Sequence, residues 1–379
     1  MHVGIGGAGL VGRLLAWRLL RAGHAVSLFD QDQGNGQQAA GFIAAAMLAP
    51  YSEAASVGSE ILEPGLKAIR LWARWLEELR DDSGRQVPWQ RRGTLVVAHQ
   101  ADQVELHWFR QRLLVLGASA SGAVRWLDRT ALRQQEPALD AFDAAVHLPR
   151  EACLDNRALF AALAVAIDRL GGRWRVGERI THVEAQRIVT EAGTHHVDMA
   201  LDCRGFGAKA QLEGLRGVRG EILWLRAPEV QLSRPVRLLH PRYQIYLAPR
   251  PQQRYVIGAT ELESESLAPV TVRSHLELLS ALYTLHPGFA EAQVLEARSH
   301  CRPAFMNNLP QIALAPGVMR VNGLYRHGYL LGPLLVQSAL ALLRGEPALA
   351  PVSVVQERKV PSAMSAAQER TVPTAIGLM

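Results

Sequence analysis

The first 30 residues have the pattern of a strand, a glycine-rich turn, a helix and a second strand. The turn follows a short apolar run at 2–6 and fits G-x-G-x-x-G at Gly7, Gly9 and Gly12. Leucines recur at helical spacing behind it. Glycines at these positions allow a tight turn and let a pyrophosphate reach the free N–H groups at the start of the helix. The segment therefore predicts a βαβ unit that binds a dinucleotide.

The second strand of this unit, predicted over 25–29, ends at Asp30. An acid at this position binds ribose hydroxyls and disfavours the 2′-phosphate of NADP. The predicted ligand is therefore FAD or NAD, and the fingerprint alone does not choose between them. The position of the unit at the start of the chain slightly favours FAD, because flavoproteins often begin on this strand.

The composition fits a globular protein of two domains that does not bind nucleic acid. The chain has 379 residues, 49% of them hydrophobic, which is enough to bury a large core. Its formal charge of +6 arises from 41 basic and 35 acidic residues that are scattered along the sequence. There is no polybasic stretch with interleaved aromatic residues, so the charge pattern disfavours a nucleic-acid partner.

The cysteines and the apolar runs predict a cytoplasmic protein without a metal or a membrane anchor. Cys153, Cys203 and Cys301 are odd in number, far apart and outside any C-x-x-C motif, which favours buried free thiols over disulfides or a zinc site. We expect no signal peptide, because the first strand begins at the second or third residue. The longest apolar runs, such as 39–50 and 330–343, are too short or too interrupted to span a bilayer.

The spacing of apolar residues predicts several helices. Helices are expected over 63–79, 157–170 and 271–283, and the tryptophans of the first are expected in the core rather than against a cofactor. A long apolar helix is expected to begin near Gly332, with Pro333 in its first turn, where proline is well placed.

The middle of the chain predicts strands of a different kind from the N-terminal unit. Runs at 219–225, 244–247 and 255–260 are separated by turn-rich segments. Alternation and spacing of this type indicate a mostly antiparallel sheet.

Two further segments bear on the dinucleotide. The residues at 39–50 are mostly small, so this stretch either packs tightly against another helix or leaves room for a flat ligand, and the sequence leaves both open. A second glycine turn at 204–208 follows a predicted strand, and in an α/β setting such a turn can approach the same dinucleotide.

Six more motifs follow the fingerprint in a defined order along the chain. They are AAAMLAP at 44–50, RGE at 219–221, YLAPR at 246–250, VIGATE at 256–261, CRP at 301–303 and GLYRHGYLLGP at 323–333. In this order they resemble the D-amino-acid oxidase superfamily of FAD enzymes, and most closely the glycine oxidases of thiamine biosynthesis. The resemblance covers about residues 2–347.

The resemblance implies an α/β fold with a Rossmann-like FAD-binding domain of the glutathione-reductase type and a second, substrate domain on a mostly antiparallel sheet. The predicted FAD-binding domain is discontinuous and the remainder forms the substrate domain. The FAD-binding domain comprises 1–84, 146–218 and 302–347, the substrate domain comprises 85–145 and 219–301, and 348–379 form a flexible C-terminal tail. An interaction peptide is the alternative for that tail.

The resemblance also implies non-covalently bound FAD and the residues that hold it. The ADP half is assigned to the fingerprint, the flavin to the alanine run and to the main chain of the last motif, and the adenine to the backbone near Ile180. The second glycine turn adds Gly205. The residues concerned are Gly7, Gly9, Leu10, Val11, Gly12, Asp30, Ala45, Ala46, Met47, Ile180, Gly205, Gly328, Tyr329 and Leu330.

Three residues are implied to act on the substrate. Arg302 resembles the family arginine that grips the substrate carboxylate as a bidentate fork, for which guanidinium suits better than ammonium. Tyr246 resembles the phenol that hydrogen-bonds the same carboxylate, and Arg326 matches an arginine near the pocket. Glu261 falls at a pocket-wall position, where it either faces a substrate ammonium or is a solvated loop acid.

The chain departs from the family pattern at several places. Asparagines stand at 307–308 where Asp-Gly is usual, and Leu324 stands where a histidine is usual. His327 lies near the usual place of an asparagine, and Ala46 replaces a common glycine. These differences bear on the flavin contacts and the substrate range more than on FAD binding.

The implied activity is oxidative deamination of glycine and other small amino acids such as sarcosine and D-alanine. The flavin would accept a hydride from the substrate α-carbon, so the protein needs to position the substrate more than to supply a strong base. Dioxygen would be reduced to hydrogen peroxide, and the imine formed from glycine would either hydrolyse to glyoxylate and ammonia or serve thiazole synthesis for thiamine. The resemblance also implies a homo-oligomer.

Other functions stay open at this stage. A D-amino-acid dehydrogenase would pass the electrons to another acceptor, and a secondary-amine oxidase would prefer sarcosine. An RNA-modifying flavoprotein is a third alternative, because a related oxidase domain acts on wobble uridines of tRNA. The altered residues at 307–308 and Leu324 also allow a flavin-binding assembly or regulatory protein with a degenerate site.

Overall fold

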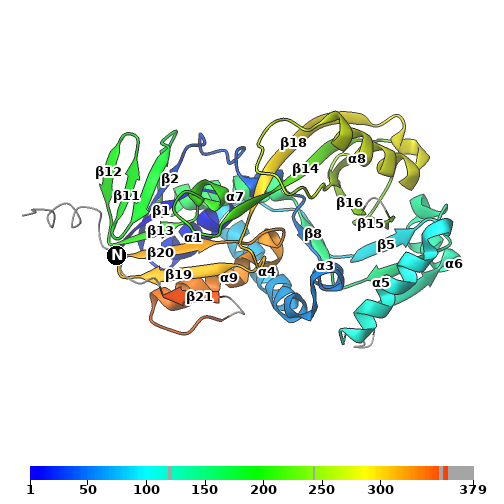
Figure 1. Cartoon of the computed structure of the whole chain (residues 1–379), viewed down its shortest axis with the longest axis horizontal. Coiled ribbons are helices and arrows are strands. Elements are labelled where there is room, and N and C mark those ends of the chain that lie inside the picture. The colour runs from blue at the N-terminus through cyan, green and yellow to red at the C-terminus, as the bar shows by residue number, and fades with distance from the viewer. Residues whose placement is uncertain (118–121, 242–243, 350–352, 357–379) are drawn as a thin grey trace, which may run out of the picture.

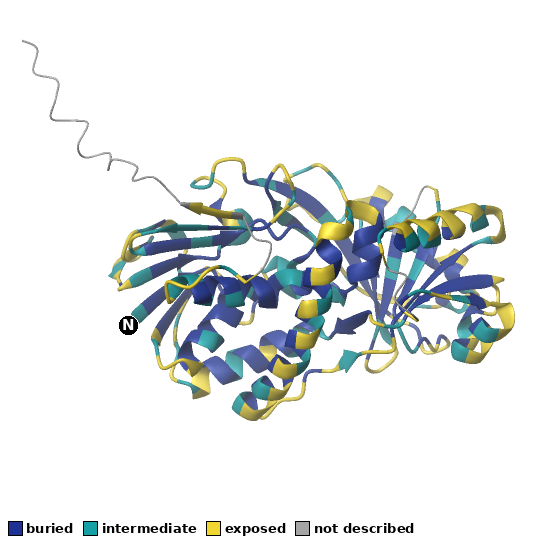
Figure 2. Ribbon diagram, turned by 90° about the horizontal axis from the view of Figure 1, so that it is seen from below, coloured by how far each residue is buried: buried dark blue, intermediate teal, exposed yellow. Residues whose placement is uncertain are grey.

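Two large β-sheets form the two halves of the protein, as the computed structural model shows (Figure 1). The structure describes residues 1–117, 122–241, 244–349 and 353–356. In both halves, buried residues lie along the strands and on the helix faces that pack against them (Figure 2). The predicted α/β fold with a mostly parallel and a mostly antiparallel part is confirmed.

The seven-stranded sheet contains the predicted βαβ unit at its centre. Neighbouring strands are parallel except for the antiparallel pair β19–β20. In spatial order the strands are β21 (Ser353–Gln356), β19 (Gln311–Ala315), β20 (Val318–Asn322), β13 (Met199–Asp202), β1 (His2–Gly6), β2 (Ala25–Asp30) and β9 (Arg173–Val176).

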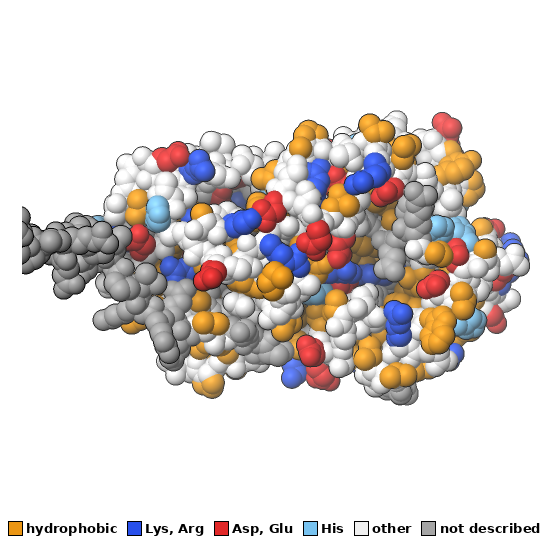
Figure 3. Space-filling view, viewed as in Figure 1, with side chains coloured by type: hydrophobic (Ala, Val, Ile, Leu, Met, Phe, Trp, Pro, Cys, Tyr) orange, Lys and Arg blue, Asp and Glu red, His pale blue; other side chains and the backbone are white. Residues whose placement is uncertain are grey.

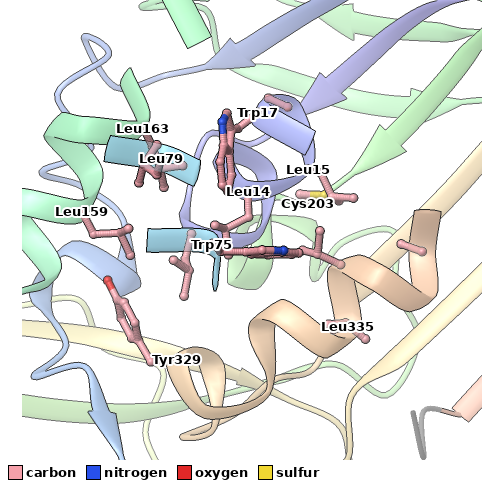
Figure 4. Packing of buried hydrophobic residues seen from close by; sticks show 14 of the residues in the cluster. Leu14, Leu15, Trp17, Trp75, Leu79, Leu159, Leu163, Cys203, Tyr329 and Leu335 are labelled. Atoms are coloured by element: carbon pink, nitrogen blue, oxygen red, sulfur yellow. The ribbon is translucent and has the colours of Figure 1, made fainter. Parts of the chain in front are cut away.

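This sheet is the middle of three layers. Its helical layer consists of α1 (Leu10–Arg21), α4 (Leu62–Ser83), α7 (Asn156–Arg169) and α9 (Gly328–Leu343). Its other face is covered by the three-stranded sheet of β10 (Ile180–Glu184), β11 (Arg187–Thr190) and β12 (Gly193–His196). In the helical layer the rings of Trp17 and Trp75 meet edge to face, with centroids 5.8 Å apart (Figure 4). Trp72 and Trp75 are each 1% exposed, so the tryptophans of α4 are core residues, as predicted.

The eight-stranded sheet is antiparallel except where β15 pairs with β5. In spatial order its strands are β18 (Gln293–Ala304), β14 (Arg216–Arg226), β17 (Arg254–Gly258), β16 (Gln244–Arg250), β15 (Val236–Leu239), β5 (Thr94–Ala98), β7 (Ala144–Leu148) and β6 (Arg125–Asp128). The helices packed on it are α5 (Gln103–Val115), α6 (Arg129–Gln135) and α8 (Val272–Leu285).

Short elements join the two halves. A small sheet of β3 (Met47–Leu48), β8 (Ala152–Leu154) and β4 (Trp89–Gln90) lies between the two large sheets, next to α3 (Pro50–Val57) (Figure 1). The helix α2 (Ala40–Ile43) precedes β3. Single turns of 3₁₀ helix occur at η1 (Ser59–Ile61), η2 (Gln100–Asp102), η3 (Pro137–Leu139), η4 (Gly205–Ala208) and η5 (Pro287–Phe289).

The start of α9 differs from the prediction. The helix begins at Gly328, so Pro333 lies inside it and not in its first turn. Proline has no N–H, so it cannot bond the carbonyl four residues earlier, which belongs to Tyr329. That carbonyl instead accepts a hydrogen bond of 2.7 Å from Nε1 of Trp72. A tryptophan of α4 thus replaces the missing helical donor, which the helical pattern of 328–343 alone did not reveal.

The predicted tail is also partly corrected. Ser353–Gln356 form β21 and pair with β19, so these four residues are part of the seven-stranded sheet. The rest of the predicted tail, 357–379, lies outside the described residues. The division into domains stays a prediction, and its boundaries at 146, 218 and 302 fall within β7, β14 and β18.

Candidate functional site

One cavity of about 1260 Å³ extends between the two large sheets. It is bordered by the glycine turn after β1, by the segment around β3, by the loop before α9 and by strands of the eight-stranded sheet. Of the residues that the resemblance assigns to FAD or to action on the substrate, all but Gly12 line it. They are Gly7, Gly9, Leu10, Val11, Asp30, Ala45, Ala46, Met47, Ile180, Gly205, Tyr246, Arg302, Arg326, Gly328, Tyr329 and Leu330.

The glycine turn is held by close backbone packing. Gly7 has a φ of 95°, and a Cβ there would lie 2.6 Å from the carbonyl oxygen of Cys203. A Cβ on Gly12 would lie only 1.9 Å from the carbonyl oxygen of Gly7. Gly12 therefore lets α1 approach the turn without lining the cavity, whereas Gly7 supplies a backbone conformation that side chains disfavour.

Asp30 sits at the end of β2 with its carboxylate fixed by the backbone. Its oxygens accept hydrogen bonds from the N–H groups of Ala8 and Asp32. Burial raises the pKa of Asp30, and these backbone hydrogen bonds and the nearby Arg13 oppose that rise. The carboxylate is thus held in one position at the cavity wall, as a receptor for ribose hydroxyls requires.

Two helix N-termini face the same cavity. Neither α1 nor α9 has a side-chain cap or an acidic residue in its first turn, and their first residues line the cavity. A Cβ on Gly328 would meet nothing within 4 Å, so the start of α9 opens onto free space. Uncapped N–H groups and the helix dipole favour negative charge at both ends. This donor set fits a cofactor that carries negative charge at two separate groups, as FAD does.

The small-residue run at 39–50 forms one wall of this cavity. Ala45, Ala46 and Met47 line it, and the carbonyl of Ala45 accepts a hydrogen bond of 2.6 Å from Arg250. Ala46 has a φ of 51°, in the left-handed region that favours glycine. The departure noted at this position therefore falls on a residue whose backbone conformation suits the usual glycine better.

The residues expected to act on the substrate lie close enough to interact electrostatically, and the part of the cavity that Arg302, Tyr246 and Arg326 line is called its substrate end below. Arg302 lies on β18 and donates hydrogen bonds to the carbonyls of Thr260 (3.0 Å) and Arg219 (3.4 Å). Among the described residues it has no ion pair with a carboxylate. Tyr246 lies on β16, and its hydroxyl has no hydrogen-bond partner among the residues that the structure describes. Burial raises the pKa of Tyr246, which keeps the phenol protonated as a donor.

Arg326 differs from Arg302 in that its guanidinium is paired with two carboxylates. Its Nε lies 2.7 Å from Oε2 of Glu53, and its Nη2 donates to Oε1 of the same carboxylate at 3.2 Å. Its Nη1 lies 3.1 Å from Oε2 of Glu261. The two carboxylates, aided by a hydrogen bond to Glu53, outweigh desolvation and raise the pKa of Arg326 further above its usual value. Arg326 therefore has no free fork for an incoming anion.

Glu53 is a buried member of the site that the sequence did not single out. It is 7% exposed and also accepts a hydrogen bond of 2.8 Å from Arg237. Burial would raise the pKa of Glu53, but the charges of Arg326, Arg237 and His327 outweigh it and hold the pKa at about 2. An acid three residues after the small-residue run at 39–50 was the available signal.

Glu261 forms a bridge at the pocket wall. Its carboxylate pairs with Arg326 and accepts a hydrogen bond from the hydroxyl of Tyr325. Its side chain remains 45% exposed. The structure therefore supports neither a purely solvated acid nor one that is free to meet an ammonium.

The described residues contain no group of three or more His, Cys, Asp or Glu side chains that could hold a metal ion. All three cysteines are buried free thiols. None of the described helices combines the length and hydropathy needed to cross a membrane. On the face seen in Figure 3, basic and acidic side chains are interspersed.

Comparison with known proteins agrees with the family resemblance seen in the sequence. Residues 2–337 match the model of a family described as FAD dependent oxidoreductases. A Rhizobium etli protein assigned by name to thiamine biosynthesis, as the oxidoreductase ThiO, is 40% identical over 351 residues, which cover 92% of this chain and 98% of that protein.

Solved structures agree in fold. The glycine oxidase of Geobacillus kaustophilus has a TM-score of 0.82 at 24% identity, covering 94% of this chain and 99% of its own. The iminodiacetate oxidase of Chelativorans sp. BNC1 has a TM-score of 0.80 at 27% identity, covering 94% of this chain and 100% of its own.

Proposed function

The chain belongs to the family of FAD-dependent oxidoreductases, and on that premise we propose that it is an oxidase of glycine and other small amino acids. The observation that carries the proposal is the state of Arg302. It lines the cavity close enough to Tyr246 to act electrostatically on that hydroxyl, and it has no carboxylate partner among the described residues. A partly buried guanidinium that has no carboxylate partner among the described residues is suited to bind the carboxylate of a ligand.

FAD would be held without a covalent bond by the cavity residues named above. When bound, FAD accepts the two electrons and the hydrogen removed from the substrate α-carbon and passes the electrons to dioxygen, which becomes hydrogen peroxide. The N–H groups at the start of α1 would bind its pyrophosphate, and Asp30 its ribose. The N–H groups of Gly328, Tyr329 and Leu330 would stabilise negative charge at the flavin.

The protein's own residues would mainly orient the substrate. Arg302 would hold the carboxylate with two parallel N–H donors, and the hydroxyl of Tyr246 would donate to one of its oxygens. Two fixed points on one carboxylate define where the α-carbon lies, which is the positional advantage that this reaction needs. The reactive amine would be neutral, so flavin reduction is expected to become faster as the pH rises.

This arrangement and the relatives both support the proposed substrate class. Glycine, water and dioxygen would give glyoxylate, ammonia and hydrogen peroxide, or the intermediate imine would be consumed before hydrolysis. The 40% identity to the Rhizobium protein supports a role of that imine in making the thiazole of thiamine. We further propose a cytoplasmic homo-oligomer, in line with the family resemblance.

The test is an anaerobic absorbance titration of the purified holoenzyme with glycine, sarcosine, D-alanine and L-alanine. We expect loss of the oxidised flavin band with glycine or sarcosine, and its return with stoichiometric peroxide when air is admitted. Bleaching that air does not reverse would indicate a dehydrogenase with another acceptor. A flavin that none of the four amines bleaches would contradict the proposal and point to a larger amine, such as one carried on tRNA.

A further inference from the structure

Three arginines act electrostatically on Tyr246 at the substrate end of the cavity, and they differ in what they are paired with. Arg237 is paired with Glu53, and Arg326 is paired with both Glu53 and Glu261. Arg302 has no carboxylate partner among the described residues. Of these three arginines, one is therefore available to an anion and two are already neutralised by the carboxylates named.

The two acids that neutralise Arg326 are not equivalent. Glu53 is buried and has a pKa of about 2, so it stays ionised and in place at any physiological pH. Glu261 lies in the loop after β17 and is 45% exposed, and it occupies only Nη1 of the guanidinium. Removing the charge of Glu261 would leave Arg326 paired with Glu53, and Nη1 would then have no anionic partner among the described residues.

We propose that Glu261 determines specificity by occupying Arg326, so that the enzyme accepts amines with one carboxylate and rejects those with two. This inference rests on the proposed function, because it concerns the substrates of that same site. A substrate bound to Arg302 through its first carboxylate would bring a second carboxylate toward Arg326. There it would meet the carboxylate of Glu261, a like charge that disfavours its binding, instead of a free guanidinium.

The test compares three amines that differ in one group. Sarcosine carries a methyl group on nitrogen, iminodiacetate carries a carboxymethyl group there, and N-ethylglycine matches the added bulk without the charge. In the wild-type holoenzyme we expect sarcosine and N-ethylglycine to reduce the flavin with similar KM values. We expect the KM for iminodiacetate to be at least about 10-fold higher than the KM for N-ethylglycine, because its second carboxylate would be repelled by Glu261 and could not pair with Arg326.

The variant Glu261→Gln is expected to change this order. It should lower the ratio of the KM for iminodiacetate to the KM for N-ethylglycine by about 10-fold, since the charge that opposes the second carboxylate is removed while Arg326 stays cationic. The matched control is Glu263→Gln, two residues away. Glu263 is paired with Arg216, has a side chain 74% exposed and does not line the cavity, so its loss should not change the ratio of the KM values.

A second variant tests whether the guanidinium of Arg326 is the group that binds the second carboxylate. In Glu261→Gln combined with Arg326→Lys, a cation still faces Glu53, but the planar fork that reaches the cavity is absent. The gain for iminodiacetate should disappear in this double variant. If the gain remains, the second carboxylate binds elsewhere and the assignment to Arg326 is wrong.

Binding of ether analogues gives a readout that does not depend on turnover. Methoxyacetate and diglycolate have the shapes of sarcosine and iminodiacetate but no amine to oxidise, and their Kd values follow from perturbation of the flavin spectrum. Glu261→Gln should tighten diglycolate selectively. The inference fails if the wild type binds diglycolate as tightly as methoxyacetate, or if Glu261→Gln leaves their Kd ratio unchanged. The proposed oxidase function, in contrast, fails if no amine bleaches the flavin or if air does not restore the bleached flavin with release of peroxide.

Discussion

The guanidinium of Arg302 lies directly over the backbone of Gly220. A Cβ on Gly220 would be 2.4 Å from Nη2 and 2.6 Å from Cζ of that arginine. The two residues lie diagonally across the β14–β18 pair, where Gly220 is opposite His300 and Arg302 is opposite Val218. The missing side chain on β14 thus creates the space in which the arginine lies, and this gives a way to move the guanidinium without removing its charge.

Gly220→Ala is expected to weaken substrate binding while leaving FAD in place. The methyl group would displace the guanidinium, so the KM for glycine should rise by roughly 10-fold, since a bidentate contact depends on geometry as well as charge. Steady-state kinetics and the flavin content of the purified variant check this. The matched control is Gly332→Ala in α9, whose Cβ would have its nearest neighbour at an ordinary 3.8 Å. Equal KM values for the two variants would contradict the expectation.

Arg302→Ala should remove most of the carboxylate-dependent affinity. We expect a KM for glycine about 100-fold higher than in the wild type, with normal flavin content, because a charged partner at a partly buried site is lost. Arg302→Lys should recover only part of the affinity, since ammonium cannot form the planar fork. An unchanged KM for glycine in the alanine variant would show that the carboxylate is held by another group.

The lowered pKa of His327 leads us to expect that the protein loses stability in mild acid. Burial, opposed by Glu53 and reinforced by Arg326, lowers the pKa of His327 from 6.5 to about 4. Between these values the unfolded chain binds a proton that the folded chain does not, so the free energy of unfolding falls as the pH decreases from 6.5 to 4. Urea unfolding should show a decrease of roughly 2 kcal/mol from pH 7 to pH 5 for this group.

The variant His327→Asn removes this group and should remove that part of the pH dependence. We therefore expect a smaller difference in unfolding free energy between pH 7 and pH 5 than in the wild type. His24, which is only slightly buried, provides the comparison through His24→Asn. If both asparagine variants retain the full wild-type pH dependence, the acid sensitivity has another source.

Glu53→Gln is expected to be strongly destabilising. It would leave the guanidinium groups of Arg326 and Arg237 without their shared buried carboxylate, at a cost of about 3–5 kcal/mol. Because the pKa of Glu53 is lowered to about 2, this stabilisation is present above pH 4.5 and is lost only as the pH falls through 2. Urea unfolding at pH 7 and pH 5 measures it. Glu60→Gln, on an exposed side chain, should change the unfolding free energy by less than about 0.5 kcal/mol.

Ala46→Gly is expected to be tolerated far better than a glycine at the neighbouring alanine. Both alanines are 2% exposed, but only Ala46 has a left-handed backbone, where an L side chain is strained by about 1–2 kcal/mol. We expect Ala46→Gly to be more stable than Ala45→Gly by about 1 kcal/mol in thermal or urea unfolding. Equal destabilisation by both substitutions would show that Ala46 carries no strain.

Several features were accessible from the sequence because they depend on neighbours along the chain. The βαβ opening follows from a strand, a glycine turn and a helix that are contiguous, and the core position of Trp72 and Trp75 follows from helical spacing. The family was recognisable because its motifs are short and keep their order. The roles of Arg302, Tyr246 and Arg326 and the domain boundaries stay predictions.

Other features depend on contacts that no local pattern contains. The start of α9 was misplaced because Pro333 favours a first turn, whereas here Trp72, 257 positions from Tyr329, supplies the donor that the proline lacks. The strand Ser353–Gln356 was missed because its pairing with β19 is decided by the edge of a sheet formed elsewhere.

The sequence by itself determined the fold class, the dinucleotide fingerprint and the family, since each depends on residue types at fixed spacing. Only the tertiary structure decided which charges neutralise one another. Glu53 and Arg326 are 273 positions apart, and their contact exists because α3 and the loop before α9 meet at one cavity. The pairing of buried charges is set by the distance between them and by their burial, and neither quantity can be read from the local sequence pattern.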